Sequence, residues 1–269
     1  MKIGNKEFDL KKRTYIMGIL NITPDSFSDG GEYNNIQQAK ERVKEMIEQG
    51  ADIIDVGGES TRPGFNEVSA EEEIERVIPV IRMIKENFDI PVSIDTYKSK
   101  TAEKAIEAGA DLINDIWGFK RDSNMANVCA KTKVPCILMH NREEIPYQNL
   151  MKDIKNDLIE SINIALDAGV PREKIILDPG IGFAKTLEEN LETMNHLEKI
   201  KELEFPMLLG TSRKSIIGLT LNLPKDERVE GTLATTVLGI TKGCEFIRVH
   251  DVKENKRVCL MADRILRSK

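Results

Sequence analysis

Short apolar runs alternate with amphipathic stretches along the chain from residue 15 onward. Residues 15–20 (YIMGIL) form a β-prone apolar run between polar residues, which predicts a buried strand. Residues 36–49 repeat apolar positions at helical spacing, and Gly50 marks the end of the predicted helix. Residues 52–56 (DIIDV) predict a second strand. The pattern therefore indicates strands and helices in alternation.

The next helix has a start signal and an internal interruption. Ser69 opens it, with Glu72 three residues later at the spacing of a capping box. Pro79 predicts a kink or a later true start, because proline lacks the backbone N–H that a helix uses. Further strands are predicted at residues 92–95, 111–115, 135–139 and 206–209, and further helices at residues 101–108 and 231–241.

A glycine that ends a helix and is followed by a strand recurs along the chain, and its spacing gives the number of βα units. Successive occurrences are about 60–74 residues apart, and each interval holds two βα units of about 30 residues. Eight such units predict a (β/α)₈ TIM barrel as a single domain over residues 1–269. In each occurrence a glycine ends a helix and a strand follows, at Gly50, Gly109, Gly169 and Gly243.

Two further expectations concern the ends of this pattern. Residues 1–13 precede the repeat and predict a hairpin around Gly4-Asn5. A doubly wound open sheet is the alternative to the barrel, although no GxGxxG motif follows the first strand to support it.

Composition and charge exclude several function classes. The 269 residues are 40% apolar and 31% charged, and the net charge of −6 argues against a general nucleic-acid-binding surface. No apolar run approaches 18 residues and the N-terminus lacks an apolar signal core, so we expect no membrane segment and a cytoplasmic protein. The cysteines show no metal-ligand spacing and are expected to be reduced, buried thiols: Cys129, Cys136, Cys244 and Cys259.

Polar residues collect where the predicted strands end. In a (β/α)₈ barrel the active site is built at the carboxyl ends of the strands, so these residues are expected to meet at one rim. Packing alone does not account for so many polar residues in one place. The ring consists of Asn21, residues 57–61 (GGEST), Asp95, Asn114, Asp115, His140, Asp178, residues 211–214 (TSRK), Arg248 and His250.

One part of the ring suits a flat heterocycle. Asp95, Asn114 and Asp178 with Lys214 combine hydrogen-bond acceptors and donors that match N–H and C=O groups at the edge of such a ring. Gly180, in the motif DPGIGFAKT, and Gly182 after it would let the backbone approach the ligand closely.

Another part of the ring suits an anion. Arg248 and His250 lie two residues apart on one predicted strand, and both can donate hydrogen bonds to an anion. Asn21 offers a neutral carbonyl oxygen, which Mg²⁺ accepts when phosphates supply the remaining ligands. The segment GTSRKS lacks the glycines of a P-loop. His140 and His196 are interpreted as ordinary barrel and helix residues.

Together these motifs resemble the dihydropteroate synthase family, the folate-pathway enzymes that sulfonamides target. The resemblance runs in order through GILNITPDSFSDGG, DIIDVGGESTRPG, SIDTYK, NDIWG, LMH, DPGIGFAK, GTSRKS and RVHDV, essentially the whole chain. It implies a homodimeric transferase that joins 6-hydroxymethyl-7,8-dihydropterin diphosphate to 4-aminobenzoate. The products would be 7,8-dihydropteroate and pyrophosphate, with Mg²⁺ as the cofactor.

The resemblance also implies a role for each site residue. Asp178, Asn114 and Lys214 would hold the pterin ring with Asp95 beside it, and Asn21 would bind Mg²⁺. The diphosphate would be held by Arg248, His250 and Thr61. The aminobenzoate site would be lined by Phe27, Pro63 and Ser215 with Arg213 nearby, and Phe183 would contact substrate. The catalytic residues would be Asp95, Lys214, Arg248 and His250.

Two other functions remain open at this point. A methyltetrahydrofolate-dependent corrinoid methyltransferase has a similar pterin-binding barrel, but it needs no diphosphate site of the kind that Asn21, Arg248 and His250 indicate. A non-catalytic pterin-binding relative would be expected to have lost residues from the two long loops after the first two strands, and both loops look complete. Turnover with both substrates would separate these possibilities.

Overall fold

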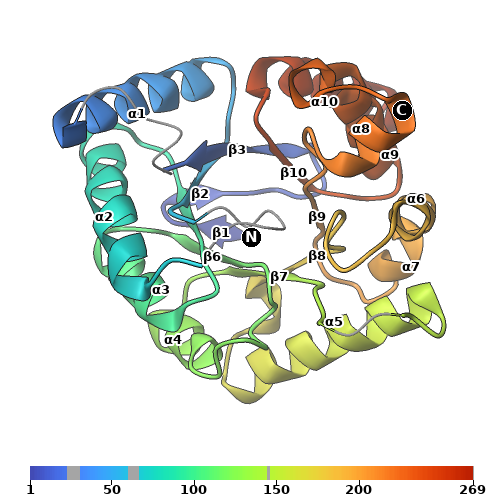
Figure 1. The fold of residues 1–269 in the computed structure, drawn as a ribbon, viewed down its shortest axis with the longest axis horizontal. Helices are drawn as coiled ribbons and strands as arrows, with labels where there is room; N and C mark the ends of the chain where they lie inside the picture. The colour runs from blue at the N-terminus through green and yellow to red at the C-terminus, as the bar shows by residue number, and fades with distance from the viewer. Residues whose placement is uncertain (23–30, 60–66, 144–145, 269) are drawn as a thin grey trace.

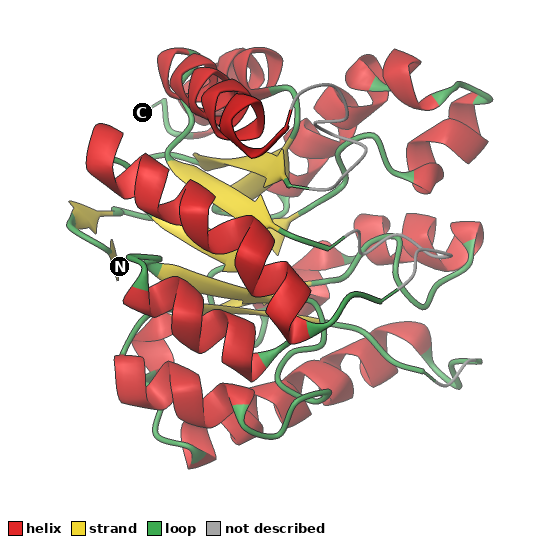
Figure 2. Cartoon of the chain, turned by 60° about the vertical axis from the view of Figure 1, so that its left-hand side comes forward, coloured by secondary structure: helices red, strands yellow, loops and turns green. Residues whose placement is uncertain are grey.

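The computed structural model describes residues 1–22, 31–59, 67–143 and 146–268, with the backbone alone for residues 31–34. Within this part of the chain, an eight-stranded parallel sheet is surrounded by helices (Figures 1 and 2). The strands of this sheet are β3 (Tyr15–Asn21), β4 (Ile53–Gly57), β5 (Val92–Asp95), β6 (Leu112–Asp115), β7 (Cys136–Met139), β8 (Ile175–Asp178), β9 (Leu208–Leu209) and β10 (Phe246–Val249).

The order of the strands closes the sheet into a barrel. Neighbours run β8-β7-β6-β5-β4-β3-β10-β9, so β3 and β10, the first and last strands of this sheet along the chain, pair with each other. The remaining seam lies between β8 and β9, where Leu177 bridges Met207 in parallel and donates its N–H to Pro206 O at 2.9 Å. The predicted (β/α)₈ barrel is therefore confirmed, and the open doubly wound sheet is wrong.

Helices occupy the connections between the strands and form the outer layer. After β8 and after β9 the chain adds a second helix, which explains the longer spacing of the last repeat. The helices are α1 (Gly31–Glu48), α2 (Ala70–Asn87), α3 (Ser99–Glu107), α4 (Met125–Thr132), α5 (Leu150–Asp167), α6 (Leu187–Asn195), α7 (Leu197–Lys201), α8 (Ser215–Leu221), α9 (Val229–Thr241) and α10 (Val252–Leu266), with 3₁₀ turns at Arg172–Lys174 and Lys225–Glu227.

Alternation along each strand produces two cores. Residues such as Ile54 and Val56 pack outward in one large cluster with the buried faces of the helices. Residues two apart from each other, such as Tyr15 and Met17, point into the barrel and form a second, separate cluster. The same strands supply both clusters. Whether a residue faces the helices or the barrel interior therefore depends on which of the two alternating sets of strand positions it occupies.

The N-terminal hairpin closes the amino end of the barrel. β1 (Lys2–Ile3) and β2 (Lys6–Glu7) pair antiparallel around Gly4, whose φ of 57° lies in the left-handed region that glycine adopts freely. Phe8 continues from the hairpin into the barrel, where its ring centroid lies 4.7 Å from that of Tyr15. The predicted hairpin is confirmed, and it leaves the carboxyl end of the barrel for other uses.

Two predicted helix starts need correction. The first helix begins at Gly31 rather than at residue 36, because its apolar face starts one turn after the helix itself. Ser69 does cap α2 by accepting the N–H of Glu72 at 3.1 Å. Pro79 lies inside an uninterrupted α2, so the later start is wrong: burial of Val77 and neighbouring apolar residues outweighs the lost backbone bond.

The described residues also bear on two sequence predictions about environment. The four cysteines are free thiols and all are buried, as expected. In the part of the chain described here, no helix combines the length and apolar character needed to cross a membrane.

Candidate active site

The barrel interior changes from apolar to polar over one step of two residues. On several strands an apolar interior residue at the amino end is followed, two positions later, by a polar residue at the carboxyl end. The change occurs from Ile53 to Asp55, from Leu112 to Asn114, from Ile176 to Asp178 and from Phe246 to Arg248. The lower layer is a packed core, and the upper layer brings polar residues predicted from separate motifs to one place.

Arg248 is held by two buried carboxylates. Its Nε donates to Asp55 Oδ2 at 2.6 Å, and its Nη2 donates to Asp95. Asn114 Nδ2 also reaches Asp55 Oδ2, at 3.3 Å. Asp55 is therefore hydrogen-bonded both to Arg248, which was predicted to bind the diphosphate, and to Asn114, which was predicted to bind the pterin. These two bonds use two of the five N–H groups of the guanidinium, so three remain for a ligand.

Asp55 was missed by the sequence analysis. It lies in the middle of a strand rather than at its end, and the search for site residues considered strand ends. The available signal was a carboxylate within the apolar run DIIDV, in a strand whose other residues are buried. A charge that is fully buried requires a partner, and this one has Arg248.

Asp95 keeps one oxygen free for a ligand. Its Oδ1 is buried and has no hydrogen-bond partner among the described residues, whereas Oδ2 accepts from Arg248. Burial raises the pKa of Asp95 to about 7, with Arg248 opposing the rise and Asp55 adding to it. An unpaired buried acceptor is costly, so a donor on a bound ligand would remove a penalty as well as form a bond.

Asp178 and Lys214 line the opposite side of the site. Asp178 Oδ1 accepts the N–H of Gly180 at 2.7 Å, and Lys214 Nζ donates to Ile181 O at 2.5 Å. The Lys214 ammonium also lies 4.5 Å from the centroid of the Phe183 ring. Burial lowers the pKa of Lys214 to about 8, against the attraction of Asp178, so the lysine is mainly charged at pH 7. The predicted pterin residues Asp178 and Lys214 are thus brought together with Phe183, which was predicted to contact substrate.

His250 is neutral. Its Nδ1 lies 3.0 Å from Ser212 Oγ, while its backbone N–H donates to the same oxygen at 3.1 Å. The hydroxyl proton is then available to Nδ1, which leaves the ring proton on Nε2. Burial lowers the pKa of His250 to about 3, and the nearby Arg248 charge adds to the effect. His250 can therefore donate one hydrogen bond to an anion but brings no positive charge.

The residues predicted around aminobenzoate are only partly described. The Arg213 guanidinium donates from Nε to Asp251 Oδ2 at 2.9 Å, and Ser215 is exposed at the start of α8. Phe27, Thr61 and Pro63 lie outside the described residues. Asp115 also belongs to the predicted ring, but its carboxylate accepts the backbone N–H groups of Trp117 and Phe119 in the turn that follows β6.

Asn21 is positioned beside the polar layer at the end of β3. The strand register places Asn21 beside Gly57, and Gly57 beside Asp95. A Cβ on Gly57 would lie 3.8 Å from Asn21 Oδ1 and 3.7 Å from Asp95 Oδ2, so the glycine leaves space between these oxygens. Among the described residues no group of three or more His, Cys, Asp or Glu side chains could hold a metal. One amide oxygen fits a Mg²⁺ ion that takes its other ligands from phosphate and water.

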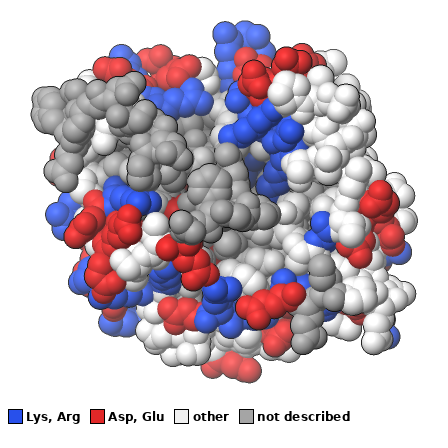
Figure 3. Space-filling view, viewed as in Figure 1, with Lys and Arg blue, Asp and Glu red and all other residues white. Residues whose placement is uncertain are grey.

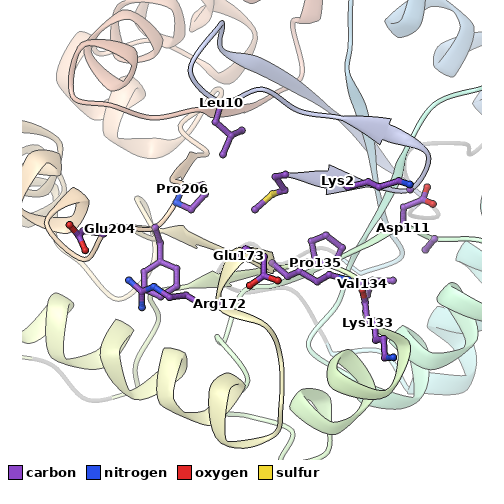
Figure 4. A pocket seen from close by; sticks show the side chains of 15 residues that line it. Lys2, Leu10, Asp111, Lys133, Val134, Pro135, Arg172, Glu173, Glu204 and Pro206 are labelled. Atoms are coloured by element: carbon purple, nitrogen blue, oxygen red, sulfur yellow. Dashed lines mark hydrogen bonds between the residues drawn. The ribbon is translucent and has the colours of Figure 1, made fainter.

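Charge and cavities distinguish the two ends of the barrel. Figure 3 shows Lys and Arg side chains beside the central hollow, over the β9 and β10 side. A cavity of about 820 Å³ lies at the opposite end, between the hairpin and the strand starts (Figure 4). Its lining includes Leu10, Pro135 and Pro206, with charged side chains around them. It lacks the converging buried polar groups of the carboxyl end, where barrel enzymes place their sites.

His140 lies in the barrel as the sequence analysis expected, and the structure adds its hydrogen-bond partners. It is completely buried, and both of its ring nitrogens have side-chain partners, Asp157 and Lys185, at 2.9 Å each. His196 does behave as an ordinary helix residue, because it joins α6 to α7 and its ring hydrogen-bonds one side chain among the described residues, Glu198, at 3.3 Å.

Comparison with known proteins gives one consistent result. A family of pterin-binding enzymes matches residues 17–250. A dihydropteroate synthase of Clostridium beijerinckii is 70% identical over 268 residues, which cover 99% of this chain and 100% of that protein. A dihydropteroate synthase of Bacillus subtilis is 56% identical over 256 residues, covering 95% of this chain and 90% of the relative.

Solved structures agree with these relatives. A dihydropteroate synthase from Clostridium difficile, crystallised in the presence of pteroic acid, superposes with a TM-score of 0.95 at 52% identity, covering 97% of this chain and 100% of that chain. A Yersinia pestis dihydropteroate synthase in a sulfonamide complex gives a TM-score of 0.93 at 40% identity, covering 100% of this chain and 99% of that chain.

Proposed function

The chain belongs to the dihydropteroate synthase family of pterin-binding enzymes, and from this membership we propose how its own residues divide the reaction. The enzyme is a transferase that condenses 6-hydroxymethyl-7,8-dihydropterin diphosphate with 4-aminobenzoate to give 7,8-dihydropteroate and pyrophosphate. The observation that carries the assignment of roles is the buried polar layer, where an unpaired acceptor on Asp95 faces the same interior as Asp178 and Arg248.

The pterin ring binds between Asp178 and Asp95. Asp178 accepts the N–H groups of the aminopyrimidinone edge, which suits a carboxylate with two oxygens. Lys214 and Asn114 donate to the ring acceptors, and the free Oδ1 of Asp95 accepts from the remaining ring N–H. Phe183, whose ring centroid lies 4.5 Å from the Lys214 ammonium, contacts the face of the pterin ring.

The diphosphate binds toward Arg248. Three guanidinium N–H groups and Nε2–H of His250 donate to phosphate oxygens, and Asp55 and Asp95 keep the guanidinium in place. Mg²⁺ at Asn21 would offset negative charge on the diphosphate and on the departing pyrophosphate. Thr61, which lies outside the described residues, is expected from the family resemblance to bind the diphosphate as well.

The chemistry needs a good leaving group more than a strong base. An aromatic amine is a weak nucleophile and is neutral at pH 7, so no residue has to remove its proton before attack. Arg248 and His250 stabilise charge as pyrophosphate leaves, and the Asp95 carboxylate stabilises positive charge spread into the pterin. From the family resemblance we expect Phe27, Pro63 and Ser215 to line the aminobenzoate site, with Arg213 near it. No covalent enzyme intermediate is required.

We expect pyrophosphate release that requires both substrates and a divalent cation. The cation requirement follows from the single neutral oxygen at Asn21, because Arg248 alone cannot balance a diphosphate in a buried site. The measurement is a coupled pyrophosphate assay with each substrate omitted in turn, run with Mg²⁺ and with a chelator.

A binding titration separates the metal from the rest of this assignment. Pyrophosphate affinity should depend on Mg²⁺ in the wild type and lose most of that dependence in Asn21→Ala. A turnover rate unaffected by chelation would contradict the metal role alone. Tight binding of methyltetrahydrofolate without release of pyrophosphate would instead contradict the assigned reaction and favour a methyltransferase.

The enzyme forms a homodimer through its last helices. α8, α9 and α10 lie together in Figure 1, and Figure 3 shows an area free of Lys and Arg over α8 and α9. Large apolar side chains are exposed on these helices, whereas exposed apolar residues of this size are normally scattered singly on a monomer. They are Leu219, Leu221, Val237, Leu238, Leu260, Met261, Ile265 and Leu266.

Light scattering should therefore give the mass of two chains. A charge placed at the most exposed positions, Leu219→Glu with Met261→Glu, should shift the mass to one chain while the circular dichroism spectrum stays unchanged. The matched change Ile159→Glu, at another exposed apolar position on α5, should leave the mass at two chains. A wild type that stays monomeric at high concentration would refute the dimer.

A further inference from the structure

Three side chains form a line of hydrogen bonds behind the pterin side of the site. Asp157, in α5, has its Oδ2 2.9 Å from Nε2 of His140, which follows β7. Nδ1 of the same imidazole is 2.9 Å from Nζ of Lys185, in the segment after β8. None of the three has a role in the reaction described above.

The chemistry of lysine sets the direction of these bonds. Burial lowers the pKa of Lys185 to about 7, against the attraction of Asp178. In its ammonium form Lys185 only donates, so Nδ1 of His140 accepts and the ring proton is on Nε2, where it donates to Asp157. Burial lowers the pKa of His140 to about 4, and the Lys185 charge adds to this against the pull of Asp157. The neutral imidazole therefore connects Asp157 to Lys185 by two hydrogen bonds and fixes the position of the Lys185 Nζ.

Lys185 spends its donors inside the protein. Besides His140, its Nζ donates to Gly180 O at 3.0 Å and to Phe183 O at 3.2 Å. An ammonium has three N–H groups, so these bonds use all of them. The two carbonyls belong to one turn, residues 180–183, which is also closed by the N–H of Phe183 on Gly180 O at 3.1 Å. Lys185 therefore fastens the turn and has no donor left for a substrate.

The 180–183 turn has a demanding backbone. Gly180 and Gly182 in the turn have φ values of 66° and 86°, and Ala184 directly after it has a φ of 47°, a left-handed region that only glycine adopts freely. A Cβ on Gly180 would lie 1.9 Å from His140 O, so the turn packs directly on the residue that holds Lys185. Such a backbone persists only where surrounding groups fix it, and Lys185 supplies two of the fixing bonds.

The same turn carries the pterin side of the site. Asp178 Oδ1 accepts an N–H from the turn at 2.7 Å, and Lys214 Nζ donates to Ile181 O within it at 2.5 Å. Phe183 ends the turn with its ring beside the Lys214 ammonium. The positive charge of Lys185 also favours the ionised form of Asp178, because it opposes the rise in the Asp178 pKa that burial causes.

We propose that Lys185 is a positioning residue of the pterin site, held in place by His140 and Asp157. By fastening residues 180–183 it sets where Asp178, Phe183 and Lys214 meet the pterin ring. This inference rests on the proposed function, since it takes these three residues as the pterin contacts.

Lys185→Met tests the proposal, since it keeps an unbranched side chain one atom shorter than lysine and removes the ammonium. Affinity for diphosphate-free pterin, measured by calorimetry, should fall about 30-fold, the size expected for lost charge-assisted bonds to the binding turn. Affinity for pyrophosphate with Mg²⁺ should change less than about twofold, because it depends on Arg248 and His250 rather than on the turn. His140→Gln should shift pterin affinity in the same direction by about fivefold, since it disturbs only one of the three bonds.

Lys201→Met is the matched control. Lys201 also donates to a backbone carbonyl, Phe205 O at 3.1 Å, and pairs with Glu245, but at the amino end of the barrel. It should lower the melting temperature and leave both affinities unchanged. If Lys185→Met gives that same result, or weakens both ligands equally, the positioning role is overturned. If Lys185→Met does not fold, unchanged pterin affinity in His140→Gln overturns it. Failure of the wild type to bind pterin would contradict the proposed function instead.

Discussion

Asp178→Ala should lower the affinity for pterin by at least ~100-fold, since each charge-assisted bond lost from a buried pocket is worth about 1.5–3 kcal/mol. The carboxylate is expected to accept two N–H groups of the pterin while it also accepts Gly180 N–H at 2.7 Å. Its loss would remove the ligand's acceptors and free one end of the 180–183 turn. Calorimetric titration with a diphosphate-free pterin measures the effect.

Two variants separate recognition from folding at this position. Asp178→Asn keeps the shape and an acceptor for the turn, but presents an amide N–H₂ to a ligand edge that itself donates, so it should also lose most pterin affinity. Asp115→Asn changes another buried carboxylate, whose hydrogen-bond partners among the described residues are the N–H groups of Trp117 and Phe119. The Asp115→Asn variant should have a lower free energy of unfolding and an unchanged affinity for pterin. A loss below tenfold in Asp178→Ala would rule out the assigned role.

Arg248→Met should have the second largest effect, on both stability and diphosphate binding. Asp55 and Asp95 would be left as buried carboxylates without their cation, and breaking a buried ion pair costs about 3–5 kcal/mol. Affinity for the pterin diphosphate and for pyrophosphate should fall by ~100-fold or more, because several charge-assisted bonds are lost together. Diphosphate-free pterin should be affected far less. Denaturant unfolding and two titrations give these quantities.

A double variant distinguishes the two roles of Arg248. Arg248→Met with Asp55→Asn removes the unpaired charge at Asp55 along with the guanidinium, so it should regain part of the lost stability. It should not regain affinity for pyrophosphate, since the donors are still absent. Recovery of pyrophosphate affinity in the double variant would show that Arg248 acts only by supporting the fold. The stability and the pyrophosphate affinity of Arg248→Lys should lie between those of the wild type and of Arg248→Met, because one ammonium cannot bond both carboxylates in the fork geometry of arginine.

The sequence by itself determined the barrel and most of the residues at its rim. Strand and helix periods are local properties, and the glycines that end helices at Gly50, Gly109, Gly169 and Gly243 all have positive φ as their position demands. Once eight units are counted, the parallel topology sends every strand's carboxyl end to the same rim. Asn114, Asp178 and Arg248, which lie far apart in sequence, could therefore be placed together before any coordinates.

Only the tertiary structure decided which partner each of these residues has. Asp55 became part of the site because β4 lies between β3 and β5, which places its carboxylate under Arg248 from the other end of the chain. His250 was expected to donate to an anion, but only its burial beside Arg248 decided that it does so as a neutral ring. His140 was expected to be a barrel residue, and the structure adds that it links Asp157 to Lys185. Period and spacing specify which way a side chain faces, whereas its charge state and hydrogen bonds depend on distances and burial that arise only when the barrel closes.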